Sequence, residues 1–264
     1  MQLLRVIIGQ YLPGDSVVHR LDPRAKIILS IVFMVSVFLV QSFPGYGLSL
    51  LYVLLALCLA RVRLGHMWRG LRPLGLIILI TVGLNAFFVE GRILAEFGPF
   101  TLSYEGLREA GLIASRLMLL VVGGSILTLT TPPLRLADGL ESLLKPTQRL
   151  GVPVHEMAMM MTIALRFIPT LLEETERIMR AQMARGAAFE SKNPVKQARN
   201  LLPMLIPLFV GAFRRADELA VAMEARAYRG GTGRTRMQPL SMSVPDVLVL
   251  AGGSVVMLAT GWVF

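Results

Sequence analysis

The sequence predicts an all-α polytopic membrane protein with about five transmembrane helices and a cytoplasmic pair of long helices. Hydrophobic residues make up 54% of its 264 residues, and its mean hydropathy of +0.63 exceeds that of a soluble domain of this size. The apolar residues gather into runs long enough to cross lipid, and the loops between these runs alternate in charge. These three observations favour a membrane protein over a soluble domain.

Five apolar runs are candidates for membrane-spanning helices. Their approximate bounds are 25–43, 46–60, 73–89, 110–130 and 244–263. A crossing needs roughly 20 residues, so the second and third runs are short. Long apolar segments at close spacing favour helices over the strands of a barrel. We therefore expect three regions, in the order membrane helices one to four, a cytoplasmic or interfacial region with two long helices, and the last transmembrane helix: 1–131, 132–240 and 241–264.

The distribution of charge predicts the orientation of these helices. Basic residues precede the first apolar run and recur between the second and third: Arg5, Arg20, Arg24, Lys26, Arg61, Arg63, Arg69 and Arg72. By contrast, the connection at 41–47 is uncharged, and the one at 90–109 carries four glutamates against two arginines. The positive-inside rule therefore places the N-terminus and residues 135–236 in the cytoplasm and the C-terminus outside. A net charge of +10 distributed in this way indicates membrane topology and not a nucleic-acid partner.

Local signals predict where the helices begin. Asp22 followed by Pro23 is a favourable cap and first-turn pair for the first transmembrane helix. Residues 134–144 have the spacing of a short amphipathic helix. Two long helices follow, and in each an apolar half precedes a charged half: 157–172 before 173–185, and 201–213 before 214–229.

The two long helices end in near-copies of one pattern. Arg185 and Arg226 each have a small residue one and four positions earlier and an aliphatic residue seven positions earlier. Helical period places each set on one stripe. One such arginine is explained by the dipole and last carbonyls of a helix end, but two copies in the same phase indicate docking. The second copy has Ala227 where the first has Gly186, which argues against left-handed backbone at residue 227.

The sequence carries no convincing catalytic or metal-binding pattern. The glycine-rich stretch 230–235 lacks the lysine of a phosphate-binding loop, and His155-Glu156 is not followed by a second histidine. The glutamates at 173, 174 and 176 have the spacing of a solvated, ion-paired helix face. We therefore expect a protein that is not an enzyme, with no metal and no cofactor on this chain.

Two polar residues within the apolar runs keep other functions open. Asn85 and Arg116 lie near the outer ends of the third and fourth runs. Polar groups at such depths can bond a neighbouring helix or snorkel, but they can also line a substrate path. An alternative interpretation is therefore a permease that encloses its own path. A membrane-bound transferase is less favoured, because the acidic metal motif that it needs is missing.

Three stretches together resemble the transmembrane T-component of energy-coupling factor (ECF) transporters, which are vitamin and metal uptake systems powered by ABC-type ATPases. These stretches are 21–26, 165–186 and 223–231. With the order of the spans, the resemblance covers essentially the whole chain. It implies a non-catalytic coupling subunit in the plasma membrane, whose two long helices cross in the cytoplasm.

The resemblance also implies partners and contact residues. Two ATPase subunits, which would hold ATP and magnesium, would bind the two helix ends at Ala184, Arg185, Gly186, Ala225, Arg226 and Ala227. A substrate-binding membrane subunit would bind the apolar halves of the long helices at Met157, Met160, Met161, Leu165, Leu201, Met204, Leu205 and Leu208. Substrate selection would then belong to another polypeptide.

Overall fold

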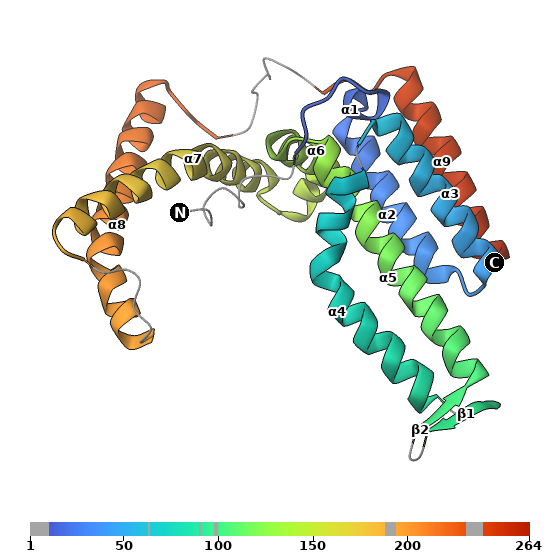
Figure 1. The fold of residues 1–264 in the computed structure, drawn as a ribbon. Helices are drawn as coiled ribbons and strands as arrows, with labels where there is room; N and C mark the ends of the chain where they lie inside the picture. Colours follow the sequence, from blue (N-terminus) through green and yellow to red (C-terminus); the bar gives the residue numbers. More distant parts are fainter. Residues whose placement is uncertain (1–10, 63, 90, 98–99, 188–193, 231–239) are drawn as a thin grey trace. The chain divides into compact units, whose positions relative to one another are not determined.

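The computed structural model describes residues 11–62, 64–89, 91–97, 100–187, 194–230 and 240–264 (Figure 1). Within this part of the chain there are two compact units. The bundle unit runs up to Leu143 and resumes at Leu240, and the second unit runs from Leu144 to Gly230. The glycine-rich stretch at 230–235 lies outside the described residues from 231 onward.

The bundle unit is built almost entirely of helices, which confirms the predicted all-α membrane class. Its helices are α1 (Val17–Arg20), α2 (Pro23–Leu39), α3 (Phe43–Ala60), α4 (Leu64–Phe88), α5 (Tyr104–Thr130), α6 (Pro133–Leu144) and α9 (Val244–Val263). Among the described residues, α3, α5 and α9 are long and apolar enough to cross a membrane, and α4 contributes the shorter apolar stretch Leu74–Phe88. The remaining predicted span corresponds to α2, which has 17 residues.

An N-cap and prolines in the first turn explain why two of these helices begin where they do. Asp22 is the N-cap of α2, where its side chain accepts a hydrogen bond from the Arg24 N–H at 2.8 Å, and Pro23 occupies the first turn, as expected. Pro44 likewise lies in the first turn of α3. The helix therefore starts at Phe43, a few residues before the predicted apolar run.

Three features of the connection between α4 and α5 and of these two helices were not predicted. A short antiparallel hairpin of β1 (Ile93–Phe97) and β2 (Phe100–Ser103) joins α4 to α5. Ser103 then caps α5 by accepting from the Gly106 N–H at 3.0 Å, so this helix begins at Tyr104 and not at about residue 110. At its other end α4 begins at Leu64, and the basic connection expected up to residue 72 is part of that helix.

Helices α2 and α9 run parallel, with a hydrogen bond near each end. The Asp22 N–H donates to Asp246 Oδ1 at 3.0 Å at one end, and the Gln41 N–H donates to the Phe264 carbonyl at 3.0 Å at the other. Helix α5 runs antiparallel to α2, because Lys26 meets Thr130 at one end of the pair. The hydrophobic core of the bundle lies among α2, α3, α5 and α9.

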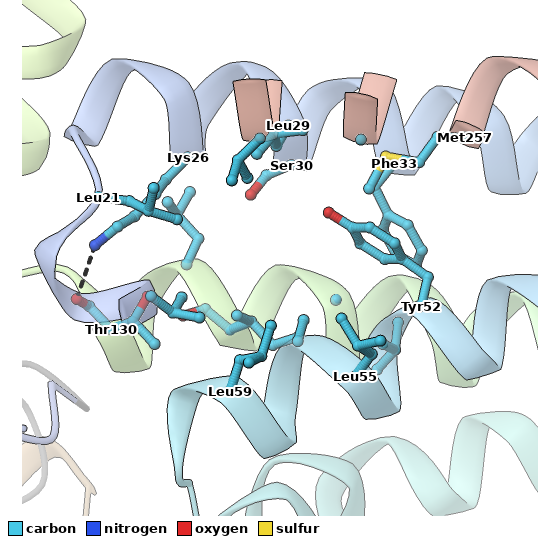
Figure 2. Close-up of a pocket in the computed structure, with 18 of the residues that line it drawn as sticks. Leu21, Lys26, Leu29, Ser30, Phe33, Tyr52, Leu55, Leu59, Thr130 and Met257 are labelled. Atoms are coloured by element: carbon cyan, nitrogen blue, oxygen red, sulfur yellow. Dashed lines mark hydrogen bonds between the residues drawn. The ribbon is translucent and has the colours of Figure 1, made fainter. Parts of the chain in front are cut away.

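The buried ammonium of Lys26 joins α2 to the end of α5 (Figure 2). Its Nζ donates to the carbonyls of His19 and Thr130 at 3.1 and 3.2 Å and to Thr131 Oγ1 at 3.1 Å. An ammonium has three N–H donors, so its hydrogen-bonding capacity is used in full. Lys26 is therefore a structural cation at a helix C-terminus, where positive charge is favoured.

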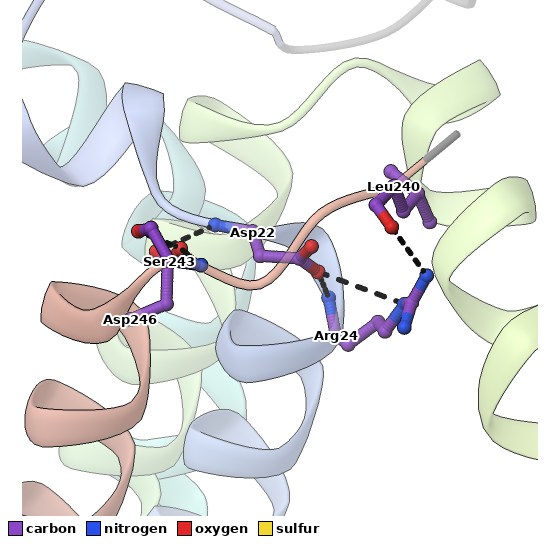
Figure 3. Close-up of polar contacts among 5 residues, drawn as sticks. All are labelled: Asp22, Arg24, Leu240, Ser243 and Asp246. Carbon is purple, nitrogen blue, oxygen red and sulfur yellow. Dashed lines mark hydrogen bonds and ion pairs between the residues drawn. The ribbon is translucent and has the colours of Figure 1, made fainter. Parts of the chain in front are cut away.

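A polar cluster joins the beginnings of α2 and α9 (Figure 3). Asp246 accepts from the Asp22 N–H and, through its other oxygen, from both the backbone and the hydroxyl of Ser243. Arg24 Nη2 donates to the Leu240 carbonyl at 3.2 Å. This cluster holds the segment by which the chain enters α9.

The second unit consists of the 3₁₀ helix η2 (Lys145–Leu150) and two long helices, α7 (Val154–Ala184) and α8 (Pro194–Ala225). Both long helices occur where the sequence predicts them, and both are continuous through internal prolines. They pack against each other, as Figure 1 shows for the yellow and orange ribbons.

Candidate docking surface on the two long helices

The ends of α7 and α8 have the same backbone geometry. In α7 the last helical residue is Ala184, Arg185 is the C-cap, and the next residue, Gly186, has a φ of 89°. The Gly186 N–H donates to Met183 O, and the Ala187 N–H donates to Gln182 O, both at 3.0 Å. This pair of bonds is the Schellman motif, which satisfies carbonyls that a helix end would otherwise leave free.

The end of α8 repeats this motif, bond for bond. The Ala227 N–H donates to Glu224 O at 2.8 Å, and the Tyr228 N–H donates to Met223 O at 3.0 Å. Ala227 has a φ of 55°, so the residue is left-handed although it is not glycine. The sequence argued against left-handed backbone at residue 227, but the residue adopts it, and the second copy therefore keeps the backbone geometry of the first. Arg185 and Arg226 are both exposed.

The two helices are joined at equivalent positions. Glu174 of α7 forms an ion pair with Arg215 of α8, and both side chains are about three-quarters buried. Glu174 precedes Arg185 by 11 residues, and Arg215 precedes Arg226 by the same number. Each exposed arginine is thus about 16 Å along its helix from the contact, at 1.5 Å per residue. A contact between equivalent positions gives the pair a local two-fold character.

A second contact follows from a missing backbone donor. Because Pro207 has no N–H, the carbonyl of Pro203 lacks its normal partner within α8. Gln182 Nε2 of α7 donates to that carbonyl at 3.3 Å. Under the same 41-residue offset that relates the two arginines, Gln182 corresponds to Met223, and Met223 lines the same hollow as Met159 and Ile163 from the first half of α7, in keeping with the two-fold character.

A hollow of about 460 Å³ borders the end of α8. It is formed where the first half of α7 meets the last turns of α8 and the residues after them. Its lining combines apolar side chains of both helices with two arginines: Met159, Ile163, Leu219, Met223, Arg226, Ala227, Tyr228, Arg229 and Gly230. Arg226 therefore stands beside a concave surface that could accept a group from a partner.

The predicted apolar contact residues differ in exposure. Met157 and Met160 are exposed by 48 and 60%, and Leu205 is also exposed. Met161, Leu165, Leu201 and Leu208 are half-buried, and Met204 is buried. Sequence reasoning did not single out a larger set of exposed apolar residues on the same half of α8: Leu202, Ile206, Phe209, Val210 and Phe213. The signal for them was present, since all lie in the predicted apolar stretch 201–213.

Comparisons with known proteins agree with this architecture. A family model described as a cobalt transport protein, CbiQ, matches residues 14–238. The energy-coupling factor transporter transmembrane protein EcfT of Thermosediminibacter oceani is 56% identical over 242 residues, which cover 92% of this chain and 91% of that protein. The chain belongs to the ECF transporter transmembrane protein family. The EcfT proteins of Clostridium kluyveri and Brevibacillus brevis are 52 and 47% identical, over 245 and 261 residues.

These similarities extend over both units of this ECF transmembrane protein. The match with the Clostridium kluyveri protein covers 92% of this chain and 91% of that one, and the match with the Brevibacillus brevis protein covers 98% of each. The family match of residues 14–238 includes the bundle helices from α1 to α6 and both long helices. The chain is thus a transport subunit of the membrane, and the arginine-ended helices lie within the part that matches the family model.

The intramembrane polar residues of this ECF transmembrane protein have partners within the bundle. Arg116 Nε donates to Tyr46 Oη at 2.9 Å, and Arg116 Nη2 donates to the Val40 carbonyl at 3.2 Å. Asn85 Nδ2 donates to the Thr81 carbonyl one turn earlier in α4 at 2.8 Å. Arg116 therefore caps the end of α2. Arg116 and Asn85 were the two residues on which the alternative interpretation, a permease that encloses its own path, depended. Their contacts within the bundle favour structural roles for both.

Proposed function

We propose that this protein is the coupling subunit of an ECF-type importer. In this proposal two ABC-type ATPase subunits, which hold ATP and magnesium, bind the ends of α7 and α8. Their movement on ATP hydrolysis is transmitted through the two helices to a separate membrane subunit that binds the substrate, a vitamin or a metal ion. This chain itself performs no hydrolysis.

The observation that carries the proposal is the equivalence of the two arginine-capped ends. Arg185 and Arg226 follow identical backbone motifs, and each lies 11 residues from the ion pair that joins the helices. Two like ATPase subunits related by a two-fold axis require two like docking sites. A single chain supplies two like docking sites when two of its helices end in the same motif at equivalent positions. A planar guanidinium on a well-ordered helix end is suited to bidentate bonds with partner carboxylates or carbonyls.

Transmission of force is supported by the contacts between α7 and α8. The Glu174–Arg215 ion pair is largely shielded from solvent, and the Gln182–Pro203 bond uses a carbonyl that has no other partner in its helix. Both contacts lie between the arginine ends and the apolar halves in α7. A movement imposed at the ends would therefore displace the helices as a pair, in the manner of a rigid-body transition.

The apolar halves are the proposed contact with the substrate-binding subunit. Met157 and Met160 on α7 and Leu205 on α8 are exposed, and Phe209 and Phe213 of α8 extend the surface. Exposed apolar area of this kind marks an interaction surface. Flexible methionine side chains adapt to partners of different shape, which suits a subunit that serves more than one partner.

The proposed orientation follows from charge. The N-terminus and both long helices lie in the cytoplasm, where the ATPases are, and the C-terminus lies outside. The basic residues that flank α2 and α3 support this orientation.

The proposal is tested by removing the two arginines together. We expect Arg185→Ala with Arg226→Ala to abolish uptake and copurification of the ATPases, because truncation of a central interface arginine costs on the order of 2 kcal/mol, or about thirtyfold in affinity, at each end. Copurification from native membranes and uptake in cells are the measurements. Each single variant should keep one docked end and show an intermediate loss.

The matched control removes two other exposed arginines of the same helices. Arg180 is paired with Glu176 one turn earlier, and Arg214 is exposed on α8. Arg180→Ala with Arg214→Ala makes the same change in net charge but leaves both helix ends intact. Wild-type uptake and ATPase recovery in the Arg185/Arg226 variant, or an equal loss in the control, would refute the assignment of these two residues.

A further inference from the structure

Two cavities lie side by side within the bundle unit. The larger, of about 300 Å³, is lined by α1, α2, α3, α5 and α9, and the smaller, of about 180 Å³, is lined by α2, α3 and α9. They share the wall residues Phe33, Tyr52, Leu55 and Met257. Phe33 and Tyr52 stack with their ring centroids 5.9 Å apart. We call the two cavities together the α3–α9 groove.

The groove is open to the surface of the bundle that faces lipid. Three leucines of α3 in its wall, Leu51, Leu55 and Leu59, are exposed by 60, 55 and 49%. Along α3 the lining extends from Leu59 to Leu48, a distance of about 16 Å at 1.5 Å per residue. The hydrocarbon of one bilayer leaflet is about 15 Å thick, half of the whole core. The groove therefore has the length of one leaflet.

The interior of the groove is mostly apolar, with polar side chains spaced along it: Lys26, Ser30 and Thr130 in the larger cavity, Tyr52 in the wall that the two cavities share, and Ser36, Ser49 and Thr260 in the smaller cavity. Figure 2 shows the hydroxyls of Ser30 and Tyr52 pointing into the larger cavity. Neither has a hydrogen-bond partner among the described residues. The Lys26 ammonium in the same wall has none of its three donors left, since all three are bound to protein oxygens. The hydroxyls can thus donate to an ester or a similar weak acceptor, but the cavity offers no free charge for a polar solute.

Two arginines stand at the end of the groove nearest Lys26. Arg20 ends α1 and precedes Leu21, which lines the larger cavity, and Arg61 follows α3 two residues after the lining residue Leu59. Helix α1 packs against α3. Both arginines are exposed, and neither forms an ion pair within the described part of the chain. Cations at the end of an apolar groove fit an anionic headgroup.

We propose that the α3–α9 groove binds one anionic glycerophospholipid from the leaflet at this end of the bundle. One acyl chain lies along α3 and α9, the ester region meets Ser30 and Tyr52, and the phosphate binds Arg20 and Arg61.

Native mass spectrometry of the full chain, purified in detergent and mixed with equal amounts of phosphatidylglycerol and phosphatidylcholine, tests the proposal. We expect one retained lipid, with phosphatidylglycerol favoured by on the order of 25-fold, because each of the two cations near the headgroup contributes about fivefold. Arg20→Gln with Arg61→Gln should bring the preference close to one. These two positions are exposed, so the change disturbs no packing.

Variants that fill the groove test the acyl-chain site separately. Ala56→Phe and Ser30→Leu each place bulk in the larger cavity and should remove the retained lipid of either kind. Cys58→Phe is the control, because Cys58 is exposed on α3 but does not line either cavity. Equal retention of the two lipids by the wild type would overturn the proposal. An unchanged lipid signal in a filling variant that elutes as folded protein would also overturn it. So would a filling variant that loses a copurifying membrane protein but keeps its lipid, because the groove would then bind that protein.

Discussion

Ala227 adopts a conformation that a side chain normally disfavours. Left-handed backbone costs an L-residue roughly 1–2 kcal/mol. At this position two hydrogen bonds depend on that conformation, from Ala227 to Glu224 and from Tyr228 to Met223. These bonds would offset that cost fully only if the carbonyls were buried, because water can bind an exposed carbonyl in their place. The end of α8 is therefore less stable than the end of α7, where Gly186 adopts the same conformation without strain. The two arginine-capped helix ends therefore share a geometry but differ in stability.

Replacing Ala227 with glycine should strengthen the end of α8. We expect Ala227→Gly to stabilise the motif by about 1 kcal/mol, because glycine adopts positive φ without steric cost. Amide hydrogen exchange measures this locally, and the Tyr228 amide should exchange about fivefold more slowly. Ala220→Gly, at an exposed position within α8, is the control and should accelerate exchange of its neighbours instead. Faster exchange at Tyr228 in the glycine variant would show that the left-handed motif does not form.

Between elements, the packing of α2 against α5 depends on a single small residue. A Cβ added at Gly123 would lie 2.2 Å from Phe33 Cε1, whereas one added at the next residue, Gly124, would lie 3.4 Å from Met34 Cε. Phe33 is 4% exposed and stacks on Tyr52, so its ring has little room to move. The adjacent glycines therefore have different roles, although they are neighbours in the sequence.

This difference predicts opposite outcomes for two one-methyl changes. We expect Gly123→Ala to destabilise the bundle by about 1–3 kcal/mol, since overpacking forces the neighbouring ring out of place. Gly124→Ala should be neutral or slightly stabilising, because alanine favours helix. Thermal unfolding of the two purified variants in the same detergent measures the difference. Equal unfolding temperatures would mean that α2 and α5 do not approach at Gly123 as described.

The sequence predicts helices more completely than it predicts their contacts. Apolar runs and the Asp22-Pro23 cap locate α2, α3, α5 and α9 to within a few residues, except for the start of α5, which Ser103 moves earlier. The start of α4 was missed because its arginines were interpreted as a loop. Neither the Glu174–Arg215 ion pair nor the Gln182 contact could be predicted, since both depend on how two helices cross. Ala227 shows the same limit, because hydrogen bonds override its intrinsic preference.

For the whole molecule, the pairing of α2 with α9 determines which end of α9 lies on the same side of the bundle as the start of α2. These helices run parallel, so the Phe264 end of α9 lies beside Gln41, and the beginning of α9 lies beside Asp22. Three apolar helices of the bundle, α3, α4 and α5, separate α2 from α9 along the chain, and three reversals of direction followed by a fourth into α9 make α9 parallel to α2. If α2 enters the membrane from the cytoplasm, α9 does so too, and the last residue reaches the opposite side. The packing thus fixes the direction of α9 relative to α2, and the basic residues predict which end of both helices lies in the cytoplasm.

Cysteine accessibility tests this orientation directly. Cys58→Ala removes the only cysteine, after which Asp15→Cys reports on the start of the bundle and Phe264→Cys reports on its other end. We expect a membrane-impermeant maleimide to label residue 264 in intact cells and residue 15 only after permeabilisation, because the arginines near α1 and α2 remain on the cytoplasmic side. Arg92→Cys, in the connection between α4 and α5, should behave like residue 264. Labelling of residues 15 and 264 from the same side would contradict the parallel pairing of α2 with α9, whereas reversal of all three would contradict the charge-based orientation and leave the pairing intact.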